Sequence, residues 1–187
     1  MAHTNSKRER LTVAARRLIH TTGYLQTTLA DIARVADVPL GNVYYYFKTK
    51  EALAQAVIAE QLQEFKQLTL DLDRLSDPHA RIDGFLSMRI VESEAIAAYG
   101  CPIGSLCTEL NKGDNQLAKM ANALMHAQLD WLGHQFRQMG KPEEANELAV
   151  QLLAQLQGAT VLAHVFKDPN MFTQQIANAK SWLDEIG

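Results

Sequence analysis

Cysteine is scarce in this sequence, which has only Cys101 and Cys107 among its 187 residues. Two cysteines are too few for the disulfide framework that stabilises many small secreted proteins. The N-terminus also lacks an uninterrupted apolar segment followed by a small-residue cleavage site, which a secretory signal would have. We therefore expect a cytoplasmic protein whose cysteines stay reduced.

Formal charge is absent from residues 148–166, and the length of this segment invites comparison with a membrane span. The segment holds three glutamines, a threonine and His164, which a single helix in lipid would tolerate badly. We therefore predict a helix that is buried in protein, and no membrane partner.

Catalytic constellations are absent as well. The sequence shows no nucleophile beside a base, no paired catalytic carboxylates, no phosphate-binding glycine loop and no zinc-ligand cluster. His126, Asp130 and His134 have helical spacing and could in principle hold a metal ion. They lie opposite the apolar stripe of their helix, which favours solvated side chains. We predict a protein that is not an enzyme and has no cofactor and no metal.

Charge is unevenly distributed along the chain. Residues 1–50 hold eight basic and three acidic residues, a balance of +5, so the other residues must sum to −8 to give the net charge of −3. A basic N-terminal segment on an acidic remainder indicates that the N-terminal segment meets a polyanion.

Apolar residues recur with helical periodicity along nearly the whole chain, without sustained β alternation, which predicts an all-α protein. The first helix ends at Gly23, and Thr28 with an aspartate three residues later predicts the capped start of a second. Pro39 can open a third helix, and Thr49 can cap a long fourth one. Later helices are predicted over residues 78–98, 105–111, 115–139, 142–166 and 169–186, about nine helices in all.

The third predicted helix carries three successive tyrosines in GNVYYYFKTKE, residues 41–51. At 100° per residue, Val43 and Phe47 share one side with Tyr44, whereas Tyr45 and Tyr46 lie on the other. Two short helices joined by a tight turn, the second exposing polar tips beside basic residues, match a helix-turn-helix that reads the major groove of DNA.

The segment TTLADIARVADVPLGNVYYYFKTKEAL, residues 27–53, resembles the DNA-binding signature of the tetracycline-repressor (TetR) family. Two positions depart from the family pattern, because Asp37 stands where glycine is usual and Pro39 where serine or threonine is usual. The resemblance implies base or phosphate contacts, or close approach of the backbone to DNA, for eight residues. These are Thr27, Thr28, Gly41, Asn42, Tyr44, Tyr45, Tyr46 and Lys50.

Two alternatives stay open in the N-terminal segment. Tyr44 lies beside the apolar side of its helix, so it can pack against the first helix as readily as it can contact DNA. Lys7, Arg8 and Arg10 are expected to attract DNA diffusely rather than to read its sequence.

The resemblance also implies the organisation of the chain. A three-helix DNA-binding head over residues 1–48 is joined by a long helix to a ligand-binding and dimerisation body over residues 49–187. The implied function is a homodimeric transcriptional regulator, most simply a repressor that leaves a palindromic operator in double-stranded DNA when a small-molecule effector binds. A DNA-binding protein for chromosome organisation or protein recruitment is one alternative, and a helical enzyme or carrier is a more distant one.

The last two helices are implied to form a four-helix bundle with their mates in the dimer. Small side chains there would allow close helix approach, although the same residues could instead pack within one chain. The implied interface residues are Ala154, Gly158, Ala159, Leu162 and Ala163.

The body is implied to hold the effector pocket, and polar residues that interrupt its apolar stripes are candidates for binding the effector. Arg89 could meet an anionic ligand or an internal carboxylate such as that of Glu92, Glu94 or Glu109. Gln128 could meet a ligand or a backbone carbonyl. Cys101 and Cys107 are expected to pack as small buried side chains rather than to sense oxidants. The candidate lining is Phe85, Arg89, Ser93, Cys101, Met120, Leu124, Gln128 and Trp131.

Overall fold

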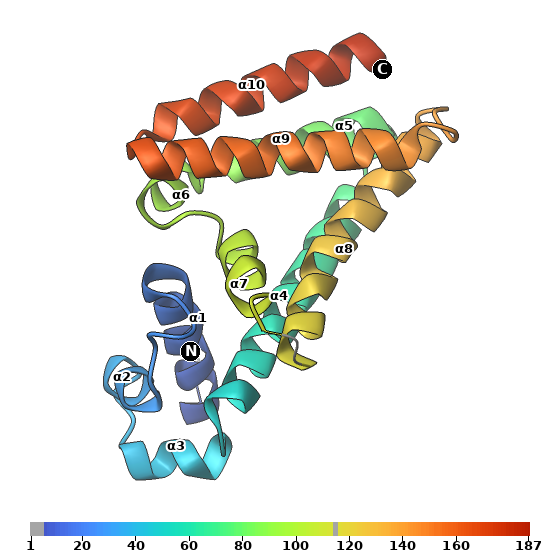
Figure 1. Cartoon of the computed structure of the whole chain (residues 1–187). Helices are drawn as coiled ribbons and strands as arrows, with labels where there is room; N and C mark the ends of the chain where they lie inside the picture. Colours follow the sequence, from blue (N-terminus) through green and yellow to red (C-terminus); the bar gives the residue numbers. More distant parts are fainter. Residues whose placement is uncertain (1–5, 114–115) are drawn as a thin grey trace, which may run out of the picture. The chain divides into compact units, whose positions relative to one another are not determined.

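The computed structural model describes residues 6–113 and 116–187, and these residues form ten helices without a strand (Figure 1). This confirms the all-α prediction. The chain divides into two compact units. The first comprises the described residues up to Gln63 together with those from Ser105 to Leu124, and the second holds the remainder.

The first unit begins with three short helices, and each start and stop follows from local sequence. Ser6 caps α1 through a capping box with Glu9, and Gly23 ends that helix with φ +93°. Thr28 caps α2 in the same way, whereas Pro39 precedes α3 without any side-chain cap. The bounds are α1 Lys7–Thr22, α2 Leu29–Val35 and α3 Leu40–Tyr46.

Parts of three further helices also contribute to the first unit. The hydroxyl of Thr49 accepts from the amide of Ala52 at 3.1 Å, as expected for the cap of the fourth helix. The buried residues of this unit include Leu11, Ile32, Leu53 and Ile58, each at most 1 % exposed. The helices that enter the unit are α4 (Lys50–Leu72), α7 (Pro102–Leu110) and α8 (Gln116–Gln138).

The second unit packs α9 against α10 and α6, and α10 against α5 and α6. The side-by-side course of α9 and α10 is visible in Figure 1. Asp77 and Asp168 cap α5 and α10, each just before a proline that suits a first helical turn. Phe85, Phe136 and Phe172 fill the core of this unit. The bounds are α5 Pro78–Ile90, α6 Ser93–Tyr99, α9 Ala145–Phe166 and α10 Pro169–Ile186.

The single helix predicted over residues 78–98 is wrong, because the structure has α5 and α6 separated at Val91 and Glu92. Val91 is 87 % exposed, so no core contact holds it in a continuous helix. The amide of Glu92 bonds the carbonyl of Arg89, a tighter i to i−3 turn that closes α5. Consequently Ser93 begins a new helix and does not extend the apolar face that carries Phe85.

Other helix boundaries shift by a few residues. The helix predicted from Ser105 begins at Pro102, because proline suits a first turn, and the helix predicted from Pro142 begins at Ala145. The predicted start at Asn115 lies outside the described residues. The compact units do not follow the predicted division at residue 48, which therefore stays a prediction about function rather than packing.

Candidate DNA-binding interface

Helix α3 is anchored on one side and open on the other. Val43 is fully buried and Phe47 is 3 % exposed, which confirms both as the anchors of the helix. Tyr45 is 78 % exposed and Tyr44 is 48 % exposed, so neither ring is used to fill the core. A phenol held in solvent offers a hydroxyl to an external partner and an apolar ring to stack or pack against it. For Tyr44, this exposure favours the contact with an external partner over packing against α1.

The two outer tyrosines also contact each other. The rings of Tyr45 and Tyr46 meet edge to face, with centroids 4.9 Å apart and an interplanar angle of 86°. Tyr46 is half-buried, so it supports the more exposed Tyr45 from one side. Such ring pairs restrict side-chain motion and thereby lower the entropy lost when a partner binds.

Gly41 leaves open space on the first turn of α3. A Cβ built at this position would meet no heavy atom within 4 Å. Nothing in the described fold therefore requires glycine here, although glycine is unfavourable inside a helix. Close approach of DNA to the α3 backbone at Gly41 stays a prediction.

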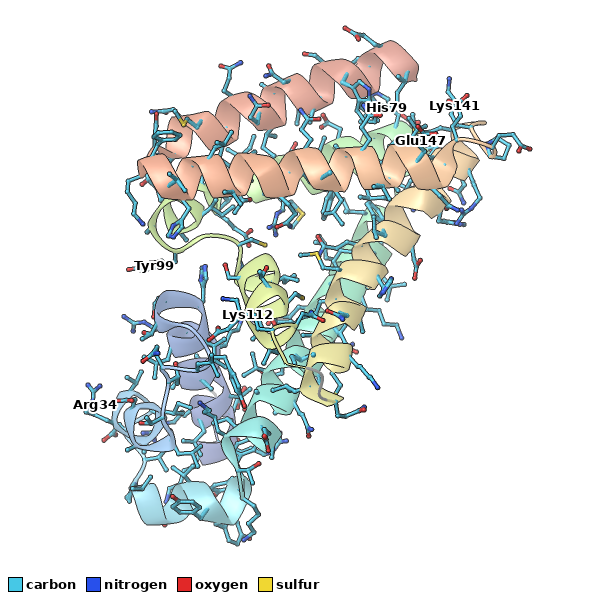
Figure 2. The ribbon with its side chains drawn as sticks, viewed as in Figure 1. Arg34, His79, Tyr99, Lys112, Lys141 and Glu147 are labelled. Atoms are coloured by element: carbon cyan, nitrogen blue, oxygen red, sulfur yellow. The ribbon has the colours of Figure 1, made fainter. Side chains whose placement is uncertain are left out.

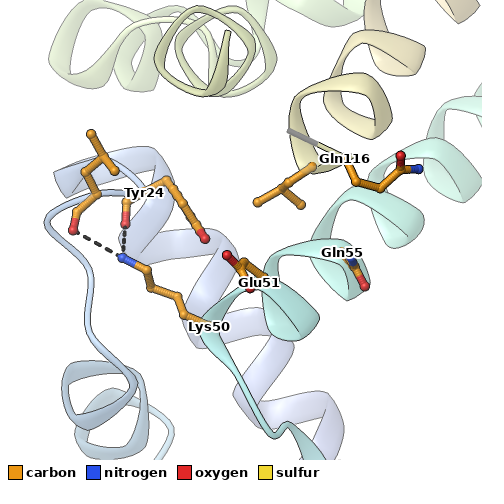
Figure 3. Close-up of a pocket in the computed structure, with 7 residues that line it drawn as sticks. Tyr24, Lys50, Glu51, Gln55 and Gln116 are labelled. Carbon is orange, nitrogen blue, oxygen red and sulfur yellow. Dashed lines mark hydrogen bonds between the residues drawn. The ribbon is translucent and has the colours of Figure 1, made fainter. Parts of the chain in front are cut away.

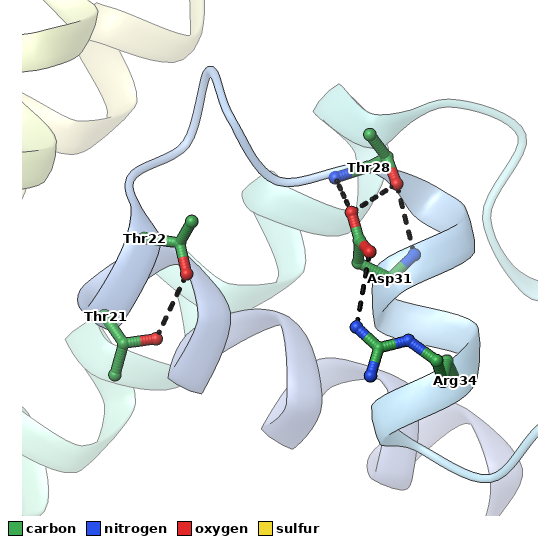
Figure 4. A network of polar contacts seen from close by, with 5 residues as sticks. All are labelled: Thr21, Thr22, Thr28, Asp31 and Arg34. Atoms are coloured by element: carbon green, nitrogen blue, oxygen red, sulfur yellow. Dashed lines mark hydrogen bonds and ion pairs between the residues drawn. The ribbon is translucent and has the colours of Figure 1, made fainter.

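A polar network holds the start of α2 (Figure 4). The Thr28 hydroxyl donates to Asp31 Oδ2 at 2.6 Å and accepts from the Asp31 amide at 3.1 Å. Arg34 donates to Asp31 Oδ1 at 3.4 Å. The Thr28 hydroxyl, the Thr28 amide and then Arg34 hold the pKa of Asp31 below its ordinary value. The hydroxyl proton of Thr28 is thus committed to a carboxylate, so its role as a DNA contact stays a prediction.

The turn between α2 and α3 forms although Asp37 replaces the usual glycine. Asp37 adopts the left-handed conformation, with φ 50°, which is unfavourable for most side chains but tolerated by aspartate. Arg10 braces this turn by donating to the carbonyl of Ala36 at 2.9 and 2.6 Å, and it also contacts the carbonyl and carboxylate of Asp37. Arg10 therefore has a structural role that sequence reasoning missed when it assigned this residue to diffuse attraction.

Two predicted contact residues are engaged inside the head. Thr27 is only 2 % exposed and donates to the carbonyl of Gly23 at 2.7 Å, so it holds the loop between α1 and α2. Lys50 Nζ donates to the carbonyls of Tyr24 and Leu25 at 3.0 and 3.2 Å, as Figure 3 shows. Both residues therefore stabilise this loop in the structure, and the expectation that they contact DNA stays a prediction.

Tyr24 belongs to the same arrangement. The Lys50 ammonium lies 4.5 Å from the centre of its ring. Burial, then the charges of Glu51 and Glu109, raise the pKa of Tyr24, so its phenol stays neutral at physiological pH. This tyrosine is 7 % exposed and belongs to the head's core, unlike the tyrosines of α3.

Exposed cations that the motif did not indicate remain available to a polyanion. Lys48 follows α3 directly and is exposed, and the side chain of Arg34 is 74 % exposed. Figure 2 shows Arg34 pointing outward from α2. Arg8 stacks over the Phe47 ring with its guanidinium carbon 5.1 Å from the centroid. The positive net charge of residues 1–50 predicts contact with a polyanion. It does not tell which basic side chains are exposed to solvent and which bind other parts of the protein.

Comparison with known proteins supplies the family. Residues 11–57 match the family of bacterial regulatory proteins called the tetR family, and residues 80–178 match the C-terminal domain of LmrA/YxaF-like transcriptional regulators. The chain belongs to the TetR family. It is therefore a transcriptional regulator with a DNA-binding domain at its N-terminus.

Individual relatives agree with this assignment along nearly the whole chain. An uncharacterized HTH-type transcriptional regulator in the lacX 3′ region of Lactococcus lactis subsp. lactis is 26 % identical over 96 % of this chain and 94 % of its own. The regulator LmrA of Bacillus subtilis is 29 % identical over 86 % of this chain and 88 % of its own. A TetR regulator structure from Legionella pneumophila superimposes with a TM-score of 0.86 at 21 % identity, covering 99 % and 98 % of the two chains.

The predicted effector residues of this TetR chain are divided between the two compact units. Met120 and Leu124 belong to the first unit, and the other six belong to the second. The pocket that would join them therefore stays a prediction. Arg89, which could have met an anionic ligand, instead pairs with Glu92 at 2.9 Å, the internal carboxylate considered above. The indole of Trp131 donates to Asp73 at 3.2 Å.

Two further candidates are buried in the second unit, and Cys107, which is not one of the predicted effector residues, is buried in the first. Gln128 and Cys101 are each 4 % exposed in the second unit, where the Cys101 sulfur accepts from the Gly104 amide at 3.2 Å. Cys107 donates to the carbonyl of Ala121 at 3.2 Å in the first unit. Neither cysteine forms a disulfide bond in the structure, and both are buried. Their expected packing role stays a prediction.

The predicted dimer residues separate onto two faces of α9. Ala159 and Ala163 are at most 3 % exposed and pack in the core of the second unit, so for them the intramolecular alternative holds. Ala154 and Gly158 are exposed, and Leu162 is 50 % exposed. The outer face that carries them, here called the outer α9 stripe, also contains Val150, Val161, Val165 and Phe166.

The outer α9 stripe also helps to explain why α9 has the composition of a possible membrane span. Among the described residues, Ala145–Phe166 is the one helix long and apolar enough to cross a membrane by length and composition alone. Its apolarity has two sources, because the inner face packs in the core of the second unit while the outer stripe faces solvent.

The candidate metal residues His126, Asp130 and His134 are all exposed on α8.

Proposed function

We propose that this regulator is a homodimeric repressor that binds a palindromic operator through α3 and leaves it when a small-molecule effector binds. The observation that carries the proposal is the outward face of α3, where Tyr45 is 78 % exposed on a helix anchored by buried Val43 and Phe47. A DNA-binding protein acts where the DNA is, so we expect the cytoplasm as its location.

The role proposed for each side chain of α3 follows from its chemistry. The Asn42 amide can both donate and accept, so it can read a base edge such as that of adenine. The hydroxyls of Tyr44, Tyr45 and Tyr46 can donate to phosphate oxygens, which position the protein without specifying sequence. Lys48 adds a charge contact that should appear in the salt dependence of binding.

The proposed dimer interface is the outer α9 stripe. Four valine, leucine and phenylalanine side chains of this stripe, each at least half exposed, would lose contact with water if a second copy covered them. Ala154 and Gly158 in the same stripe would let two helices approach closely. These residues are Val161, Leu162, Val165 and Phe166.

The proposed release mechanism requires two conformations with different affinities for the operator. An effector can shift the equilibrium between them only by binding one better than the other. Because two α3 helices must meet half-sites at a fixed spacing of about one helical turn, a small change in their separation is sufficient to weaken binding.

Selection of duplexes from a random DNA library by the purified protein tests this function. We expect enrichment of one sequence with two-fold symmetry, bound by two protomers with an affinity that falls as salt rises. Enrichment of no sequence would contradict operator recognition, and many dispersed genomic sites would favour a role in chromosome organisation. Release of the selected duplex by compounds that raise the melting temperature of the protein tests the effector.

A further inference from the structure

We propose that Glu109 of α7 is a positioning residue for the DNA-binding head, because its carboxylate fixes the loop between α1 and α2. This inference rests on the proposed operator binding. Glu109 lies far along the chain from the helix-turn-helix, and no DNA-binding motif includes it. The structure nevertheless brings it to the loop that leads into α2.

The carboxylate engages two successive peptide groups. Glu109 Oε2 accepts from the amide of Tyr24 at 2.8 Å, and Oε1 accepts from the amide of Leu25 at 2.7 Å. Each oxygen thus binds one N–H group, and hydrogen bonds to an ionised acceptor are stronger than those between neutral groups. The two contacts fix both the position and the direction of this short segment.

Gly23 lies beside this contact and provides the backbone conformation that the loop requires. It has φ +93°, a conformation that side chains rarely adopt, and a Cβ there would lie 3.4 and 3.5 Å from the two oxygens of Glu109. The same glycine ends α1 and offers its carbonyl to the Thr27 hydroxyl at 2.7 Å. One residue therefore links the helix end, the carboxylate contact and the approach to α2.

Lys50 binds the same short segment from its carbonyl side, and the peptide group between Tyr24 and Leu25 is held by both charged residues. Its ammonium binds the carbonyls of Tyr24 and Leu25, whose amides bind Glu109 (Figure 3). A cation on the Tyr24 carbonyl and an anion on the Leu25 amide polarise the peptide group between these residues in the same direction. The two charged residues should therefore act as one unit, here called the loop clamp.

Only a short stretch of chain separates the loop clamp, which includes Glu109 of α7, from the start of the helix-turn-helix at α2. After one further residue, the clamped segment is followed by buried Thr27 and then by Thr28, the cap of α2. A cavity of about 540 Å³ lies against Tyr24, Leu25 and Lys50, so water can compete for the clamp if α7 moves. Displacement of Glu109 would release two amides and free the start of α2, on which the placement of α3 depends.

Replacement of the carboxylate tests the proposal. Glu109→Gln keeps the size of the side chain but leaves one acceptor for two amides, and Glu109→Ala removes both. Binding to the selected operator should fall by about tenfold in the alanine variant and by less in the glutamine variant, while helix content is kept. Glu94→Gln, which changes an exposed glutamate on α6, should bind as the wild type does.

Hydrogen exchange gives a second readout that does not involve DNA. The amides of Tyr24 and Leu25 should exchange at least about tenfold faster in Glu109→Ala, whereas amides in the core of the second unit should keep their rates. Unchanged exchange at both amides would overturn the loop clamp. Faster exchange with unchanged or tighter operator binding would overturn its positioning role.

Combination with Lys50→Met tests whether the clamp acts as a unit. Because both side chains hold the peptide group between Tyr24 and Leu25, the double variant Lys50→Met, Glu109→Ala should lose less operator affinity than the product of the two single losses. Fully independent losses would overturn the joint action. If the wild type selects no operator, the proposed function fails, while the exchange rates of the double and single variants still decide whether the clamp exists.

Discussion

The outer faces of α3 and α9 both leave large side chains in solvent, but they differ in chemistry. The exposed aromatic residues of α3 are tyrosines, each with an apolar ring and a hydroxyl, whereas the outer α9 stripe consists of aliphatic residues, a glycine and a phenylalanine. A phenol hydroxyl can satisfy a phosphate oxygen, and an apolar side chain gains by excluding water. The difference indicates a polar, charged partner for α3 and an apolar partner for α9.

The inner faces of the same two helices are alike. Val43 anchors α3 and Ala163 anchors α9, and neither has measurable exposure. A hydrophobic inner face thus tells only that a helix belongs to a folded unit. The outer face carries the functional information, because nothing within the fold accounts for its composition.

The largest expected effect comes from a charge in the outer α9 stripe. Leu162→Glu should fold, because Leu162 is half exposed, but it should convert the proposed dimer into monomers. Burial of an unpaired carboxylate in an interface costs about 2 to 5 kcal/mol, and operator binding should fall with the dimer. Sedimentation equilibrium measures the assembly, with His126→Glu on the exposed part of α8 as the matched control. A dimer of unchanged strength would place the interface elsewhere.

Removal of one hydroxyl from α3 should have the next largest effect. Tyr45→Phe should leave the melting temperature unchanged, because this side chain is 78 % exposed. If its hydroxyl donates to a phosphate, affinity for all duplexes should fall by about 1.5 to 3 kcal/mol, the range for hydrogen bonds to charged groups. Fluorescence anisotropy on selected and scrambled duplexes measures this. A loss confined to the selected operator would instead make Tyr45 a base reader.

Two neighbouring lysines should respond differently. Lys48→Ala should reduce the salt slope of DNA binding by about one unit, which corresponds to about a 3.5-fold change between 50 and 200 mM salt. Lys50→Ala should instead lower the melting temperature, because Lys50 holds two backbone carbonyls. Salt titrations and thermal melts of both variants separate the roles. Equal salt slopes for the two variants would contradict the distinction.

Gly41 should show effects of opposite sign on stability and binding. Gly41→Ala meets no atom of the fold, so it should stabilise α3 by about 0.5 to 1 kcal/mol. The added methyl group should nevertheless weaken operator binding if the DNA backbone approaches α3 closely. Chemical denaturation and anisotropy give the two quantities. If Gly41→Ala stabilises the protein but does not weaken operator binding, the proposed close approach of the DNA backbone to α3 is contradicted.

The smallest expected effect concerns the cap of α2. Because the folded pKa of Asp31 lies below the ordinary value of 3.8, its contribution to stability is present above that pH and is lost as pH falls through the folded pKa. Asp31→Asn should therefore be destabilising at neutral pH. An NMR titration of the Asp31 carboxyl should show a midpoint below 3.8. A midpoint at or above the ordinary value would contradict the prediction that ionised Asp31 stabilises the start of α2.

Local patterns in the sequence predicted local structure well. The capping box at Thr28, the anchors Val43 and Phe47, and the exposure of Tyr45 all follow from spacing and side-chain chemistry. The break at Glu92 escaped prediction because apolar periodicity runs across it, and nothing local shows that Val91 lacks a core to pack against.

Roles that depend on distant contacts could not be predicted. Lys50 was assigned to DNA because its sequence neighbours are basic and aromatic, whereas its partners are 25 and 26 residues away. Arg10 and Glu109 bind backbone atoms, which leave no mark on the sequence. The two faces of α9 are both apolar, so composition alone could not tell buried Ala159 from exposed Ala154.

The central claim, that α3 reads DNA sequence, is tested most directly by the specificity ratio of Asn42→Ala. This ratio compares affinity for the selected operator with affinity for a scrambled duplex at one salt concentration. The account predicts a loss of about 1 to 3 kcal/mol on the operator, little change on the scrambled duplex, and relaxed preference at one position of each half-site. An equal loss on both duplexes, or no loss on either, would contradict it.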